Sequence, residues 1–90
     1  MTPASPVPPE VADELDRLVR RWQQLPLDRA VAAFSDVRAV VLDLAGEDVP
    51  DHGPAVVMDQ LRVMAYDRCR DGMPAAELAG RLADLRRRLP

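Results

Sequence analysis

Apolar residues recur every three or four positions along most of this chain, and turn-forming residues divide the pattern into four segments. Such spacing puts the apolar side chains on one face of an α-helix, because a helix completes a turn in about 3.6 residues. The pattern predicts helices over about 9–25, 27–45, 54–70 and 74–89. Short connections between helices of similar length favour a small antiparallel four-helix bundle. The expected fold class is therefore all-α.

The first and last segments carry the most regular apolar stripes. The stripe of the first segment consists of Val11, Leu15, Leu18, Val19 and Trp22, and that of the last consists of Leu78, Leu82, Leu85 and Leu89. Gly80 interrupts the last segment. It either permits another helix to approach closely or weakens the helix by about 1 kcal/mol relative to alanine.

The segment 37–44 (Val-Arg-Ala-Val-Val-Leu-Asp-Leu) allows two interpretations. Taken alone, it looks like the buried β-strand that opens a βα unit. Within 27–45, the same residues continue a helical stripe, and Gly46 supplies a plausible C-terminal stop. A strand needs a partner for its backbone N–H and C=O groups, and no other segment offers one. The helix is therefore favoured.

The third segment is apolar around most of its circumference. Such a helix either lies at the centre of the bundle or contacts another subunit with its second face. Self-association also suits a chain of 90 residues, because small domains bury only roughly 60–65% of their unfolded surface. We expect a homodimer or another protein partner, and the candidate interface residues are Trp22, Val57, Met58, Leu61 and Met64.

Composition and the N-terminal sequence define the remaining organisation. The proline-rich stretch 1–8 predicts a disordered, flexible tail, and 9–90 form a single helical domain. All twelve basic residues are arginine, a bias typical of GC-rich bacterial genomes, so the choice of arginine is weak evidence for guanidinium chemistry. The single cysteine, Cys69, allows no internal disulfide, and no signal-peptide or membrane-span pattern is visible. We expect a cytoplasmic protein.

Few residues could carry out catalysis or bind a metal. The candidate nucleophiles and bases outside the tail are Ser35, His52, Tyr66 and Cys69. A helix spanning roughly 20–25 Å separates His52 from Cys69, too far for a catalytic dyad. The loop acids Glu47, Asp48 and Asp51 do not follow the ligand spacing of a calcium or zinc site. We therefore predict no enzyme activity, no cofactor and no bound metal.

The C-terminal part of the chain is basic, although the net charge of the whole chain is −3. DNA-binding domains usually have a basic footprint, so nucleic-acid binding is disfavoured. The sequence favours a non-enzymatic protein–protein interaction or regulatory module. One alternative is a bundle that binds a small molecule between its helices. The other is a DNA-binding regulator whose candidate contacts are Arg81, Arg86, Arg87 and Arg88.

Overall fold

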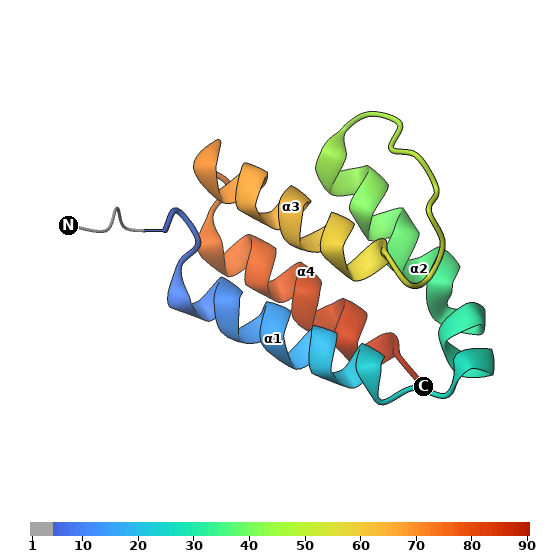
Figure 1. Cartoon of the computed structure of the whole chain (residues 1–90). Coiled ribbons are helices and arrows are strands. Elements are labelled where there is room, and N and C mark those ends of the chain that lie inside the picture. Colours follow the sequence, from blue (N-terminus) through green and yellow to red (C-terminus); the bar gives the residue numbers. More distant parts are fainter. Residues whose placement is uncertain (1–4) are drawn as a thin grey trace.

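The computed structural model describes residues 5–90. This part of the chain forms four helices, α1 (Pro9–Gln23), α2 (Leu27–Ala45), α3 (Val57–Arg70) and α4 (Ala75–Arg88), and no strand (Figure 1). The predicted all-α four-helix bundle is confirmed. The segment 37–44 lies inside α2, so the helical interpretation is confirmed as well. The third helix begins later than predicted, because 54–56 form a turn in which the Val56 N–H donates to the Gly53 carbonyl at 3.3 Å.

The connection between α2 and α3 decides how the helices pair. Short connections make α1 and α2 antiparallel, and likewise α3 and α4 (Figure 1). The segment 46–56 instead returns along the outside of the bundle, so α2 and α3 run in the same direction. The closely packed pairs are α1 with α4 and α2 with α3, and both pairs are parallel. The predicted antiparallel arrangement therefore holds for helices joined by short connections, but not for the two closely packed pairs. The segment 46–56 is a crossover connection, which some four-helix bundles contain.

Prolines begin three of the helices. Pro8, Pro26 and Pro74 occupy the N-cap positions of α1, α2 and α4, and no side chain caps these helices by a hydrogen bond. The Pro26 carbonyl accepts the N–H groups of Arg29 and Ala30, both at 3.0 Å. Proline also steers the residue before it away from helical geometry. Each of these prolines therefore separates its helix from the preceding segment.

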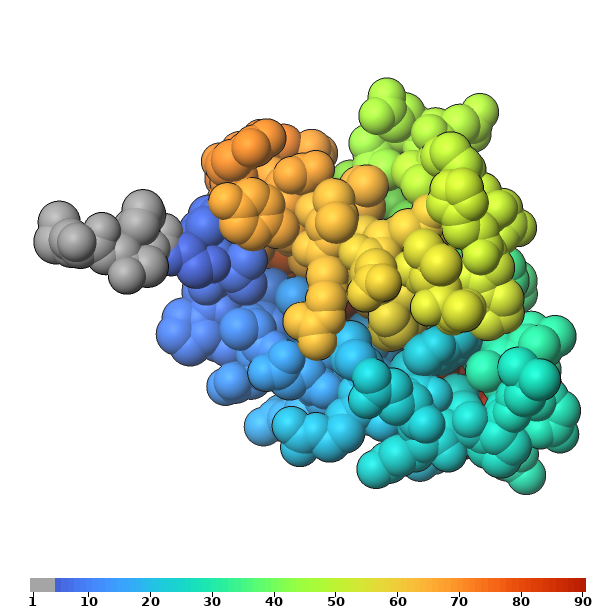
Figure 2. Space-filling model, in the orientation of Figure 1, coloured from blue at the N-terminus to red at the C-terminus, as the bar shows by residue number. Residues whose placement is uncertain are grey.

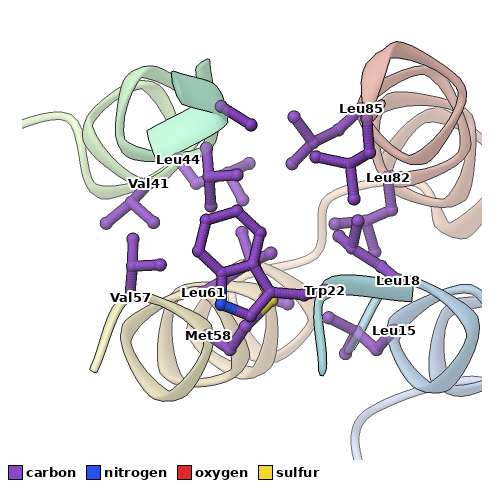
Figure 3. Packing of buried hydrophobic residues seen from close by; sticks show 14 of the residues in the cluster. Leu15, Leu18, Trp22, Val41, Leu44, Val57, Met58, Leu61, Leu82 and Leu85 are labelled. Atoms are coloured by element: carbon purple, nitrogen blue, oxygen red, sulfur yellow. The ribbon is translucent and has the colours of Figure 1, made fainter. Parts of the chain in front are cut away.

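The core lies between the α1–α4 pair and the α2–α3 pair. All buried side chains in the described residues are apolar. Every helix contributes some that are almost completely buried: Val11, Leu18, Val37, Val41, Leu44, Val57, Leu61, Leu78, Leu82 and Leu85. The ring of Trp22 belongs to this cluster and lies beside Met58, at the end of the core where α1 ends and α2 and α3 begin (Figure 3). All four helices thus share one core.

The N-terminal segment packs before α1 begins. Of the predicted tail, 1–8, residues 1–4 lie outside the described part of the chain. Val7 is half-buried and packs against the core, and its N–H donates to the Ser5 Oγ at 3.2 Å. Packing therefore starts upstream of residue 9, where the sequence predicts the domain to begin.

Candidate functional site

The candidate catalytic side chains lie on separate parts of the fold. Ser35 is exposed on α2, His52 is exposed in the segment 46–56, and Tyr66 and Cys69 lie on α3. Within residues 5–90, none of these side chains hydrogen-bonds to another. Burial raises the pKa of the Cys69 thiol, and a raised pKa disfavours the reactive thiolate. The described residues also contain no group of three or more side chains suited to hold a metal ion.

The structure revises the candidate protein interface. Four of its five residues, Trp22, Val57, Met58 and Leu61, are buried within the chain itself. The fifth, Met64, is half-buried and packs against the core. Contacts inside the bundle thus account for most of the apolar circumference of α3, apart from the exposed Val63 and Tyr66.

Among residues 5–90, the large apolar side chains classed as exposed are Leu27, Val31, Val63 and Tyr66. Leu27 and Val31 are one turn apart at the start of α2, and their side chains are 77% and 57% exposed. They share a broad apolar face with the buried Ala30 and Val37. From the sequence, all of these residues belong to one stripe, so the exposed part of the stripe was not distinguishable. The one sequence signal for an exposed apolar region on α2 is the width of its apolar face, which is broader than a helix needs to pack against one neighbour.

A groove opens beside Leu27, between the C-terminal end of α1 and the beginnings of α2 and α3. Its volume is about 530 Å³. The apolar lining residues are Val19, Trp22, Leu25, Leu27, Ala30, Pro54, Ala55 and Met58, and the polar ones are Gln23, Asp59 and Arg62. Figure 2 shows the seam between α1 and α3 in which the groove lies. We call this feature the Leu27 groove.

An ion pair crosses the same seam. Arg62 of α3 lies 3.6 Å from Asp16 of α1, measured from Nη2 to Oδ1. Beyond it, a smaller hollow of about 280 Å³ is lined in part by Val7, Leu15 and Tyr66. Arg62 lines both hollows, so its side chain separates the Leu27 groove from the smaller one.

The arginines predicted to contact nucleic acid divide between two faces of α4. Arg81 pairs with Asp43 of α2, whereas Arg86 pairs with Glu14 of α1 at 3.3 Å. Five positions along a helix correspond to a rotation of about 140° around its axis, so the two side chains point to different neighbours. Arg88 is exposed and makes no ion pair within the described residues. The four arginines therefore do not form one surface.

Arg86 and Arg87 of α4 lie beside arginines of α1 instead. A cleft of about 390 Å³ between the C-terminal ends of α1 and α4 is lined by Arg17, Arg20, Arg21, Gln24, Arg86, Arg87 and Leu89. The α1 arginines follow acidic residues in sequence, a pattern typical of an ordinary solvated helix face. Only the parallel pairing of α1 and α4 brings the two groups together (Figure 1). We call this feature the arginine cleft.

No protein-family model matches the chain, and neither a curated protein nor a solved structure matches it. None of the helices formed by residues 5–90 has the length and apolarity that crossing a bilayer requires. The groove and the cleft are therefore the observations from which a function can be inferred.

Proposed function

We propose that this protein is a self-associating interaction module whose copies pair through Leu27, Val31 and the Leu27 groove. The observation that supports this proposal is the position of Leu27, which is 77% exposed and lines a groove in which eight of the eleven lining residues are apolar. An exposed leucine by itself is ordinary on a protein surface. A leucine that protrudes beside a groove lined largely by apolar residues is less common than an isolated exposed leucine. The single free cysteine suits a reducing compartment, so the proposed setting is the cytoplasm.

A second copy of the chain fits this surface because the surface carries both halves of a contact. In a twofold dimer every contact occurs twice: if one residue of the first copy touches a second residue of its partner, the partner's first residue touches the second residue of the first copy. Leu27 of one copy would enter the groove of its partner, and the partner's leucine would enter the first groove. Burying an exposed leucine or valine contributes roughly 1.5–3 kcal/mol.

Charge in the groove supports the same arrangement. Asp59 and Arg62 both belong to its lining and carry opposite charges. A twofold axis can place the aspartate of one copy near the arginine of the other, which helps to set the register of the two chains. A standard interface buries about 800 Å² on each partner, or roughly 15% of the 5505 Å² surface of this chain. The interface therefore extends beyond Leu27 and Val31 to the groove rim.

Light scattering after size-exclusion chromatography, over a range of protein concentrations, tests the proposal. The mass of the parent protein should rise with concentration from 10.0 kDa toward twice that value. The double variant Leu27→Asp/Val31→Asp should remain monomeric, because a charge in the apolar contact is left without a partner. Its circular dichroism spectrum should be unchanged, since both side chains are exposed in the monomer.

Val63→Asp is the matched control. Val63 is 53% exposed on α3 and lies outside the Leu27 groove. This variant should dimerise like the parent. A parent protein that stays monomeric at millimolar concentration would contradict the proposal. An equal loss of mass in Val63→Asp would contradict this choice of surface.

A further inference from the structure

A second surface, independent of the Leu27 groove, is suited to a different ligand. We infer that the arginine cleft binds a small ligand carrying two or more linked phosphoryl groups. The lining of the cleft contains five arginines and no carboxylate. Its volume of about 390 Å³ accommodates a compact anion.

Three nearby carboxylates neutralise only part of the positive charge. Glu14 pairs with Arg17 at 3.2 Å and with Arg86 at 3.3 Å. Asp84 pairs with Arg87. The carboxylate of Pro90, the last residue of the sequence, accepts from Arg21, so five guanidinium groups and three carboxylates leave a local charge of +2. This corner of the molecule is therefore basic although the whole chain has a net charge of −3.

Two of the arginines keep donors available for a ligand. Arg20 makes no ion pair or side-chain hydrogen bond within residues 5–90. Arg21 donates one N–H group to a carboxylate oxygen of Pro90, the last residue of the sequence, and makes no other side-chain hydrogen bond within residues 5–90. A guanidinium group has five N–H donors in a planar fork that matches the spacing of phosphate oxygens. Arg20 and Arg21 can therefore each offer N–H groups to a phosphoryl group.

The surroundings favour a small ligand over a nucleic acid. The cleft has no aromatic side chain on which a base could stack. Exposed acids gather elsewhere, at the end of α2 and in the segment after it: Asp43, Glu47, Asp48 and Asp51. Charges separated by more than about 8–10 Å are largely screened at physiological salt. A compact anion thus interacts mainly with the arginines, whereas a long polyanion also meets these acids.

Isothermal titration of the full chain with pyrophosphate at 150 mM salt tests the inference. We expect saturable binding of one pyrophosphate per chain, and at least tenfold weaker binding of orthophosphate, which engages fewer guanidinium groups. The variant Arg20→Gln/Arg21→Gln should weaken pyrophosphate binding at least tenfold. The control variant Arg68→Gln/Arg70→Gln loses the same charge at the opposite end of the bundle (Figure 1) and should bind like the parent.

Two further ligands distinguish the source of the phosphoryl groups. If ATP without magnesium binds as tightly as pyrophosphate, the phosphoryl chain is the recognised element. Tighter binding of ATP would assign the ligand to the nucleotides. The inference is overturned if pyrophosphate shows no saturable binding up to millimolar concentration, or if the control variant loses binding equally. It is also overturned if a DNA duplex binds tightly and pyrophosphate does not displace it.

Discussion

At the scale of single residues, two glycines of this chain have different physical roles. Gly46 ends α2 in the left-handed conformation, with φ of 69°, and its N–H donates to the Leu42 carbonyl. This confirms it as the predicted helix stop. Gly80 lies inside α4 in ordinary helical geometry, and a Cβ atom there would meet nothing within 4 Å. Of the two roles considered for Gly80, close helix approach is therefore excluded.

The substitution Gly80→Ala should raise the free energy of unfolding by about 0.5–1 kcal/mol. Alanine restricts the unfolded chain more than glycine does, and the open space around Gly80 causes no clash. Gly46→Ala is the contrasting variant. It should lower the free energy of unfolding by about 1–2 kcal/mol, because the left-handed conformation strains any residue with a Cβ atom. Urea unfolding followed by circular dichroism measures both. A Gly80→Ala protein no more stable than the parent would contradict this account.

At the scale of elements, the crossover segment 46–56 depends on side chains of the helices beside it. Arg38 of α2 donates to the Val49 carbonyl at 2.7 Å and lies 4.0 Å from Asp51. Gln60 of α3 donates to the Pro50 carbonyl at 2.8 Å. These polar contacts join the segment to α2 and α3. The segment has no helix or strand of its own to determine its path.

Replacing Arg38 by methionine should loosen the crossover segment. The change removes a charge-assisted hydrogen bond from a side chain that is only 22% exposed, so we expect a loss of about 1–2 kcal/mol. Hydrogen exchange measured by mass spectrometry should become faster in 46–56 than in α1 or α4. Arg29→Met, which alters an exposed arginine of the same helix, should leave exchange unchanged. Equal exchange in both variants would show that Arg38 does not hold the segment.

At the scale of the whole molecule, the two helix pairs depend on one core. Trp22, the chain's only tryptophan, extends from α1 into this core and meets α2 and α3 there (Figure 3). Small domains with a single core usually unfold in one cooperative step. Separate unfolding of the α1–α4 and α2–α3 pairs would expose apolar surface on both. We therefore expect one transition for the entire bundle.

Trp22 fluorescence tests this cooperativity. The red shift of its emission in urea should coincide with the loss of helical circular dichroism. Trp22→Ala should lower the free energy of unfolding by about 3–5 kcal/mol, because it leaves a large cavity in the core. Leu27→Ala, at an exposed apolar position, should change it by less than about 0.5 kcal/mol when measured at a concentration where the chain is monomeric. Two separated transitions in the parent protein would disprove a shared core.

The sequence by itself determined the helices, because the signals that form and end a helix are local. The apolar period, the proline at position 26 and the glycine at 46 define α2 with the predicted boundaries, Leu27–Ala45. The boundary of α3 differs, because whether 54–56 continue the helix or form a turn depends on the crossover that delivers the chain to Val57. The assignment of 37–44 as a helix also required no tertiary information, since a lone strand would leave its backbone groups unpaired.

Only the tertiary structure decided which apolar and charged side chains reach solvent. A helical stripe indicates the direction in which a helix buries residues, but its neighbours determine how wide the buried face becomes. For this reason Trp22 and Leu61 became core residues, while Leu27 of α2 remained exposed. The arginine cleft depends on the same choice. The crossover sets the parallel pairing of α1 and α4, and that pairing brings residues 17–21 beside residues 86 and 87.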